Sequence, residues 1–416
     1  MKTRVYKFGG ASIKDAESIR NVAHVLKVAG FERTLMIVSA IGKTTNALEE
    51  VVERYFAQDA TDARIGEISL RHLEISVELF PSDHGVFREV EVFFENMRAF
   101  LRRNKSLKYD FVYDQVVACG ELISTRIVSE YLNLIGIQNT WIDVRDYIKT
   151  DSSYREARVD WEETANHIRT LDKTKFYITQ GFLGSDPNCF TTTLGREGSD
   201  YTAAIFSYCL NAEQQTIWKD VPGVLNADPR YFSDAKLLHN IPYEEAIELA
   251  YYGASVIHPK TLHPLQEKGI PLYVRSFLQP DQPGTAVTHR ASIEPLLPCY
   301  IVKKDQVLLS FSSRDFSFIA EKDLSELFQS LVAHLMKVTL IQSSAISFSV
   351  CVNDKLDQLD LLVEKLGSRY KIKVSKGVSL YTIRHYNETV VSKFTEDKMI
   401  LLQQLTVDTA QWIVKE

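Results

Sequence analysis

Apolar and polar positions along the chain predict short buried strands, each followed by an amphipathic helix. Residues 5–8 and 35–38 form continuous apolar or β-type runs, which are typical of parallel strands buried on both faces. Between them, apolar residues from Ile19 to Leu26 recur at helical spacing. A strand, a helix and a second strand therefore open the chain.

The same alternation continues to about residue 290. Further strands are predicted at 116–118, 176–179 and 216–218. We expect the first of these to end at Gly120-Glu121 and to lead into a helix, while residues 60–105 predict a helical excursion over the sheet. The predicted fold class is therefore α/β, a three-layer sandwich with a mostly parallel central sheet. In such folds the loops at the carboxyl ends of the strands bind ligands.

The pattern changes near residue 295. Pro295 and Pro298 lie in a short linker, and beyond it strands and helices follow in the order β-α-β-β-α. A stretch rich in strands, with little helix, completes the chain. We therefore predict a domain over residues 1–294 and a smaller α+β region over residues 295–416.

Composition narrows the classes of partner and compartment. Apolar residues make up 45% and charged residues 25%, as in an ordinary globular protein, and the net charge of −6 disfavours nucleic acid or an acidic membrane as a partner. We find no apolar signal core behind the first charges and no apolar run long enough to span a membrane. Five widely spaced cysteines without a CxxC pair predict reduced thiols and no zinc site. These features favour a cytoplasmic protein.

The first candidate for chemistry lies where the first strand ends, at Lys7-Phe8-Gly9-Gly10. Glycine lets a backbone approach an anion closely, and a lysine there can neutralise charge on phosphoryl oxygens. By itself such a sequence is often only a turn. A Walker A loop is excluded, because Ile37 stands where that motif needs its first glycine.

The second candidate is residues 191–200, where threonines, glycines and charges cluster. Arg196 can bind a carboxylate through two parallel hydrogen bonds. Ser199 and Asp200 fall where the next helix begins, so a capping role for either remains open. Glu121 similarly reads either as a first-turn acid or as a carboxylate that binds a substrate ammonium group.

A third group follows the strand at 216–218. Lys219 and Arg230 lie beside the turn signals Pro222-Gly223 and Asp228-Pro229, where they can face a nucleotide polyphosphate. The collected groups bind anions, a carboxylate and an amine, but no GxSxG elbow supplies a nucleophile. This pattern favours phosphoryl transfer, in which the protein mainly positions reactants and stabilises charge.

Taken together, these segments resemble the aspartate kinases of the amino-acid kinase superfamily. The matching segments, in the family's order, are residues 7–12, 38–40 with 45–46, 120–124, 179–184, 191–200, 220–224 with 228–230, and 252–254 with 258–259. The resemblance implies ATP-dependent phosphorylation of the L-aspartate side-chain carboxylate to 4-phospho-L-aspartate, the first step toward lysine, threonine and methionine. It implies Mg²⁺ as the companion of ATP.

The resemblance also implies residue roles. Lys7 would stabilise the transferring phosphoryl group, Arg196 would meet the α-carboxylate, and Asp200 would orient the cationic groups and help to hold Mg²⁺. Glu121 would meet the α-ammonium group. The aspartate pocket would further include Ser39, Ala40, Thr45 and Ser199, and the nucleotide contacts would come from Lys7, Gly9, Gly10, Lys219, Asp220, Leu225, Arg230 and Lys260.

Two positions depart from the family pattern near the nucleotide. Leu225 stands where the family commonly has Tyr, so an aromatic contact is lost. Ser255 stands where it commonly has Lys, and Lys260, five residues later, is the candidate substitute.

The region after residue 295 resembles the paired ACT-like modules that bind feedback amino acids and dimerise the family. This implies a homodimer or higher homo-oligomer and a possible amino-acid effector. The second module is compressed, because residues 384–399 leave little room for its first helix. Lysine-sensitive members carry acids at the places of Thr339 and Ala345, so we expect weak or absent inhibition by lysine.

Two alternatives remain at this point. One alternative to an aspartate kinase is another acid kinase of the same superfamily, such as a glutamate 5-kinase or an acetylglutamate kinase. The other is an amino-acid-binding regulatory protein that kept an inactive kinase fold. The contexts of Glu121 and Arg196 and the ACT-like tail favour aspartate. The presence of Lys7, Glu121, Arg196 and Asp200 together favours an active enzyme.

Overall fold

The computed structural model describes residues 3–254, 257–289, 292–315, 317–354, 356–396 and 398–415, and the chain divides into two compact units. The first unit comprises Met1–Val224, Leu237–Ile247 and Val256–Glu294. The second comprises Leu225–Lys236, Glu248–Ser255 and Pro295–Glu416. Two short segments of the α/β part of the sequence therefore pack with the C-terminal region.

The first unit is built on an eight-stranded sheet in the order β3-β4-β2-β1-β7-β9-β10-β8. The described strand pairs of this sheet are parallel except β9–β10. The predicted mostly parallel sheet is thus confirmed. Its strands are β1 (Arg4–Phe8), β2 (Thr34–Val38), β3 (Thr140–Trp141), β4 (Tyr177–Gln180), β7 (Gln214–Lys219), β8 (Asn240–Pro242), β9 (Leu272–Ser276) and β10 (Thr285–Thr288), and a separate hairpin consists of β5 (Leu183–Ser185) and β6 (Thr191–Thr193).

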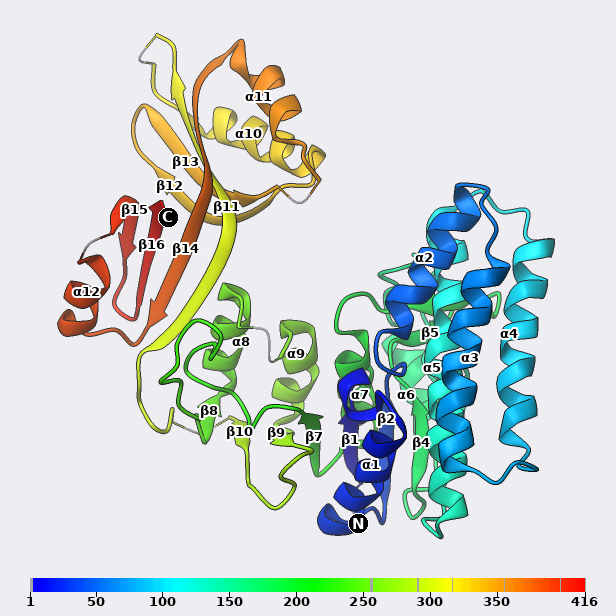
Figure 1. The fold of residues 1–416 in the computed structure, drawn as a ribbon. Coiled ribbons are helices and arrows are strands. Elements are labelled where there is room, and N and C mark those ends of the chain that lie inside the picture. The colour runs from blue at the N-terminus through cyan, green and yellow to red at the C-terminus, as the bar shows by residue number, and fades with distance from the viewer. Residues whose placement is uncertain are drawn as a thin grey trace. The chain divides into compact units, whose positions relative to one another are not determined.

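Helices cover both faces of this sheet, which gives the three predicted layers (Figure 1). On one face Tyr6 and Phe8 of β1 pack into a core with α1, α3, α4 and α5, and on the other α7 lies against β1 and β7 with α6 and α9 beside it. In the described part of the chain no helix is long and apolar enough to cross a membrane. The bounds are η1 (Gly10–Ile13), α1 (Ala16–Ala29), α2 (Thr44–Phe56), α3 (Asp62–Leu79), α4 (Val86–Arg103), α5 (Tyr109–Leu134), η2 (Val144–Asp146), α6 (Trp161–Ile168), α7 (Gly198–Leu210), α8 (Tyr243–Tyr252) and α9 (Pro259–Lys268).

The predicted strand at residues 116–118 is wrong. These residues and Gly120-Glu121 lie inside α5, a helix of 26 residues, and not at the end of a strand. A short apolar run does not by itself distinguish a buried strand from a buried helix. Here the helix is buried on nearly every side from Val112 to Leu132, so no polar face reveals its helical period.

The second unit is a six-stranded antiparallel sheet in the order β12-β13-β11-β14-β16-β15. Helices α10 and α11 share a core with one half of this sheet, and α12 packs on the other half (Figure 1). The observed order β11-α10-β12-β13-α11 matches the predicted β-α-β-β-α, and the segment 384–399 holds one short helix. The bounds are β11 (Cys299–Ser313), α10 (Glu321–Ala333), β12 (Lys337–Ser343), β13 (Ser347–Asn353), α11 (Leu359–Gly367), β14 (Tyr370–Arg384), α12 (Glu388–Thr395), β15 (Met399–Leu405) and β16 (Thr409–Lys415).

A histidine is buried between α3 and α4 in the first unit. The side chain of His72 has no exposed surface, its ring lies 5.7 Å from that of Phe94, and its Nδ1 is 2.7 Å from the carbonyl oxygen of Ile68. Burial lowers the pKa of His72 from 6.5 to about 4, because an apolar site disfavours the charged imidazolium. The unfolded chain therefore binds this proton more readily than the folded protein.

We predict that His72→Leu makes the first unit less sensitive to acid. Below pH 6.5 the unfolded state gains a proton that the folded state rejects, so wild-type stability falls as pH drops from 6.5 toward 4. This linkage amounts to about 2 kcal/mol at pH 5. Urea unfolding at pH 7 and pH 5 checks it: the wild type should lose more stability over this interval than the variant does. Equal losses in the two proteins would show that His72 is not the group responsible.

Candidate functional site

A cavity of about 940 Å³ opens in the first unit where several strand ends and loops meet. It is lined by groups from β1, from the loop after β2, from α5 and from the start of α7. Of the residues singled out from the sequence, the cavity brings together Lys7, Gly10, Ser39, Ala40, Thr45, Glu121, Arg196 and Ser199. Segments that are nearly 200 positions apart in the chain therefore form one wall.

The centre of the charged part of the site is Asp200, in the first turn of α7. Its side chain has no exposed surface, and one carboxylate oxygen lies 2.5 Å from Nζ of Lys7 while the other lies 3.8 Å from Nζ of Lys219. Burial acts to raise the pKa of Asp200, but the charges of Lys7 and Lys219 outweigh it, so the pKa lies below its ordinary value. The group is therefore an ionised carboxylate that holds two ammonium groups beside the cavity.

Strand register explains why both lysines reach the same carboxylate. β1 and β7 are parallel neighbours in which Lys7 pairs with Ile217. Because side chains alternate between faces along a strand, Lys219 points to the same face as Ile217 and Lys7. That is the face covered by α7.

The turn after β1 lies close to the loop after β2. A Cβ atom on Gly10 would lie 2.6 Å from the carbonyl oxygen of Gly42 and 2.8 Å from that of Ala40, so a larger residue would push the two loops apart. The N–H of Ser39 also donates to the carbonyl oxygen of Phe8 at 3.1 Å. The Gly-Gly turn thus serves close packing of two cavity loops, beside any role toward an anion.

Helix α5 contributes the second buried carboxylate, Glu121. Gly120 allows its approach, since a Cβ there would lie 3.1 Å from Cβ of Ala40 and 3.3 Å from the side chains of Leu48 and Thr44. The hydroxyl of Ser124, one turn later, donates to the carbonyl oxygen of Ser39 at 2.7 Å. A glycine in a helix interior costs about 1 kcal/mol relative to alanine. Here it allows α5 to contact the loop that carries Ala40.

One carboxylate oxygen of Glu121 is buried without a hydrogen bond. It is 3% exposed, and its Oε2 has no hydrogen-bond partner among the residues that the structure describes. Burial raises the pKa of Glu121 to about 8, and backbone hydrogen bonds at Glu121 and Ala40 offset only part of that rise. A cation that entered the cavity would satisfy this oxygen and favour its ionised form.

The arginine-bearing loop follows β6. Arg196 is exposed and lines the cavity, and α7 begins two residues later at Gly198. Neither Ser199 nor Asp200 caps this helix through its side chain, because the N-cap position is occupied by Glu197 without a side-chain hydrogen bond. The capping alternative for these two residues is therefore wrong.

The predicted nucleotide residues are distributed more widely. Asp220 is exposed just after β7, and Lys260 lines a second cavity of about 390 Å³, with its Nζ 6.0 Å from the ring centre of Tyr201. Leu225 and Arg230 belong to the second unit, where Arg230 pairs with Asp228 at 2.6 Å. Ser255 lies outside the described residues, and Gly9 places no side chain in the site.

The sequence interpretation did not identify part of the cavity wall. Several of these residues come from the start and body of α5 and from the loop around Arg155, which no motif marked, while others lie in the matched segments 45–46 and 191–200 but received no role. Phe182 lies inside a segment that was matched to the family, but nothing singled it out. The further lining residues are Gly42, Asn46, Asp110, Tyr113, Tyr154, Arg155, Glu156, Phe182, Gly195, Glu197 and Gly198.

We predict that Glu121→Gln stabilises the protein at neutral pH. Because the folded-state pKa lies above the unfolded value of 4.5, wild-type stability falls as pH rises from 4.5 toward 8, and a neutral amide avoids this loss. The variant should gain about 3 kcal/mol at pH 7 and nothing at pH 4.5. Denaturant unfolding at both pH values measures this, with the exposed Glu53→Gln as the matched control. A gain of equal size at both pH values would contradict the buried, unpaired carboxylate.

Known proteins similar to this chain identify its family. The model described as "Amino acid kinase family" matches residues 2–276. Lysine-sensitive aspartokinase 3 of Escherichia coli is 31% identical over 395 residues, which are 91% of this chain and 86% of the relative. The bifunctional aspartokinase/homoserine dehydrogenase 1 of Arabidopsis thaliana is 29% identical over 90% of this chain, which spans 42% of that longer protein.

Solved structures agree in fold along the whole length. The crystal structure of E. coli aspartokinase III in complex with lysine and aspartate has a TM-score of 0.84 at 28% identity and covers 100% of this chain and 96% of its own. The same enzyme in complex with aspartate and ADP has a TM-score of 0.83. The chain therefore belongs to the amino acid kinase family and, within it, to the aspartokinases.

Proposed function

We propose that the chain transfers the γ-phosphoryl group of ATP to the side-chain carboxylate of L-aspartate, giving 4-phospho-L-aspartate. One observation carries this proposal. The buried Oε2 atom of Glu121 has no hydrogen-bond partner among the described residues, and it lies in the same cavity as Lys7 and Arg196. An amino acid with two carboxylates offers an ammonium group for Glu121 and an α-carboxylate for Arg196. Its second carboxylate is then left as the phosphoryl acceptor.

The chemistry needs no nucleophile from the protein. A side-chain carboxylate oxygen of aspartate attacks the γ-phosphorus, an acyl-phosphate bond forms, and the bond from phosphorus to the bridging oxygen breaks to release ADP. Negative charge on the transferring group is what the site has to stabilise. Lys7, held by the buried Asp200 at 2.5 Å, supplies a fixed positive charge for this purpose.

We propose that Mg²⁺ enters with the nucleotide. Its preferred ligands are oxygens, and in kinases many of them are phosphate oxygens and water. The described residues contain no group of three His, Cys, Asp or Glu side chains able to hold a metal ion on their own. An ion carried by ATP would neutralise charge on the β- and γ-phosphates, with Asp200 nearby.

The ligands bound to related enzymes support the choice of substrate. Aspartate and ADP are bound in one structure of the E. coli enzyme, and lysine and aspartate in the other. We further propose a reducing cytoplasmic location, which the five free cysteines fit, and self-association through the second unit.

The first test is a phosphorylation assay that traps the acyl phosphate with hydroxylamine. With ATP and Mg²⁺ the wild type should turn over L-aspartate much faster than L-glutamate. Lys7→Ala should lower kcat by at least about tenfold, equivalent to roughly 1.4 kcal/mol of lost transition-state stabilisation. The exposed Lys27→Ala is the matched control, and thermal unfolding of both variants shows whether they are folded. Aspartate turning over no faster than glutamate, or a smaller loss in a folded Lys7→Ala variant, would overturn the assignment.

Regulation by lysine is proposed to be weak or absent. Thr339 lies in β12, and its hydroxyl donates to the carbonyl oxygen of Cys351 at 3.0 Å. Ala345 is exposed in the turn between β12 and β13. Neither residue offers a negative charge to an ammonium group, and a charged hydrogen bond is about twice as strong as a neutral one.

We predict that lysine at physiological concentration leaves aspartate phosphorylation by the wild type unchanged. The double variant Thr339→Asp with Ala345→Glu should gain measurable lysine binding, since it places two carboxylates where the wild type has none. Isothermal calorimetry and the hydroxamate assay, each with and without lysine, measure this. Tight lysine binding with inhibition of the wild type would refute the proposal.

A further inference from the structure

A buried carboxylate on α5 holds two loops of the cavity together. Asp114 has no exposed surface, yet three donors from outside its helix reach its two oxygens. The N–H of Arg155 lies 3.2 and 3.0 Å from the two oxygens, the N–H of Thr193 donates to Oδ2 at 2.8 Å, and the Thr193 hydroxyl donates to Oδ1 at 2.8 Å. Both loops are therefore fixed to one point of the helix.

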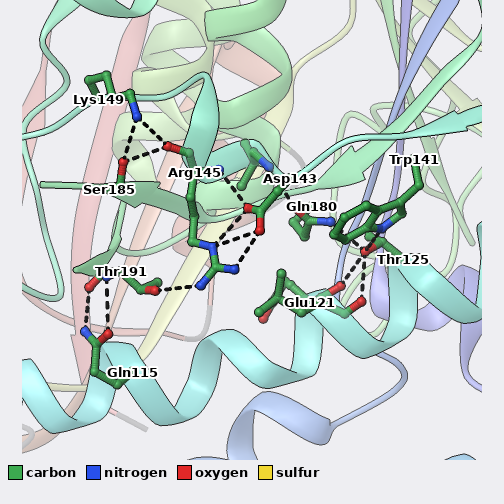
Figure 2. Close-up of polar contacts among 12 residues, drawn as sticks. Gln115, Glu121, Thr125, Trp141, Asp143, Arg145, Lys149, Gln180, Ser185 and Thr191 are labelled. Carbon is green, nitrogen blue, oxygen red and sulfur yellow. Dashed lines mark hydrogen bonds and ion pairs between the residues drawn. The ribbon is translucent and has the colours of Figure 1, made fainter. Parts of the chain in front are cut away.

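The next residue of α5 holds the other end of β6. Gln115 donates from Nε2 to the carbonyl oxygen of Thr191 at 2.7 Å and accepts from the N–H of Thr191 at 3.2 Å (Figure 2). The Thr191 hydroxyl also accepts a hydrogen bond from Arg145 at 3.1 Å, and Arg145 is itself paired with Asp143 at 2.6 Å. We call Asp114 and Gln115 the α5 clasp.

The two loops held by the clasp carry arginines into the cavity. Arg155 lies on one and Arg196, three residues after Thr193, on the other, and both line the cavity. The loops also contact each other directly, because the N–H of Ala157 donates to the carbonyl oxygen of Thr193 at 2.9 Å. A shift of either loop therefore moves the other.

Strain in the first loop indicates that the clasp stabilises a conformation that the chain would not otherwise adopt. Arg155 has a φ of 67°, in the left-handed region that disfavours a residue with a side chain. Such a residue costs on the order of 1 kcal/mol or more and persists where its surroundings over-determine it. The guanidinium of Arg155 lies 4.5 Å from the ring centre of Tyr113, at the cavity wall, so the strained backbone aims this side chain at the site.

The charge of Asp114 fits this task. Burial raises the pKa of Asp114 to about 6, while the hydrogen bonds from Arg155 and Thr193 act in the opposite direction. All three partners are donors, so the clasp needs an acceptor on both oxygens. An ionised carboxylate provides this, and an amide in its place would set an N–H against another N–H.

We propose that the α5 clasp positions the arginine-bearing loops for acceptor binding, so that Asp114 and Gln115 set the affinity for the amino-acid substrate without touching it. The proposal rests on the proposed function, because Arg196 is taken to bind the α-carboxylate. It predicts that loss of the clasp weakens the binding of aspartate and leaves the binding of ATP unchanged. The hydrogen bonds of the clasp described above go to Arg155, Thr191 and Thr193, so we expect the ATP side at Lys7 and Asp200 to keep its geometry without the clasp.

The sharpest variant is Thr193→Val, which keeps the shape of a buried residue outside the cavity lining but removes the hydroxyl donor to Asp114. It should raise KM for aspartate by about tenfold, as expected for one lost buried hydrogen bond, with KM for ATP and kcat within about twofold. Thr193→Ser retains the hydroxyl and should behave as the wild type. Thr34→Val removes a hydroxyl of a fully buried threonine at the start of β2, which donates to Glu32 at 3.2 Å, and controls for general destabilisation.

Gln115→Met is a second, independent test variant. Gln115 is only half-buried, so we expect the fold to tolerate the change. It removes both contacts to Thr191 and should raise KM for aspartate in the same selective way. Suppose that the wild type phosphorylates aspartate. If the folded Thr193→Val and Gln115→Met variants then have the wild-type KM for aspartate, or if their KM for ATP rises as much as their KM for aspartate, the clasp proposal is overturned while the proposed function stands. A wild type that does not turn over aspartate overturns the proposed function and the clasp with it.

Discussion

The buried contact between Lys7 and Asp200 is the interaction on which the rest of the site depends. It joins β1 to the first turn of α7, and Lys219 of the adjacent β7 completes it at 3.8 Å. Removing one partner of a buried pair leaves a charge without compensation, which is far more costly than the pair itself is favourable. The three groups are therefore mutually required, and they place positive charge at the carboxyl end of the central strands, where α/β folds bind ligands.

The buried carboxylates of Asp200, beside the cavity, and Glu121, in its wall, differ in state because their surroundings differ. Asp200 faces two ammonium groups, and its pKa lies below the ordinary value. Among the described residues Glu121 has no such neighbour, and burial raises its pKa to about 8. The charge of Asp200 is thus balanced by the protein itself, while the Oε2 atom of Glu121 has no hydrogen-bond partner among the described residues. Under the proposed function, this difference separates the phosphoryl side of the site from the amino-acid side.

Helix α5 organises the amino-acid side. Gly120 brings it against Ala40, Glu121 enters the cavity from it, and Asp114 fixes the loops that carry Arg155 and Arg196. A helix buried on nearly all sides is well suited to this, because its side chains cannot move without disturbing the core. Under the proposed function, specificity for the acceptor is thereby built into the packing of one element.

Local pattern alone determined the α/β alternation, the strands around Lys7 and Lys219, and the glycine-rich junctions, because hydrophobic period and turn chemistry are short-range properties. Glu121, Arg196 and Asp200 were candidates from their local context, and the resemblance in motif order joined them into one site. Only tertiary structure decided that residues 116–118 are helical, that Tyr113 and Arg155 face the cavity, and that Leu225 and Arg230 pack with the second unit. These outcomes depend on which surfaces meet after the chain has folded, and no local period of the sequence encodes contacts between segments so far apart.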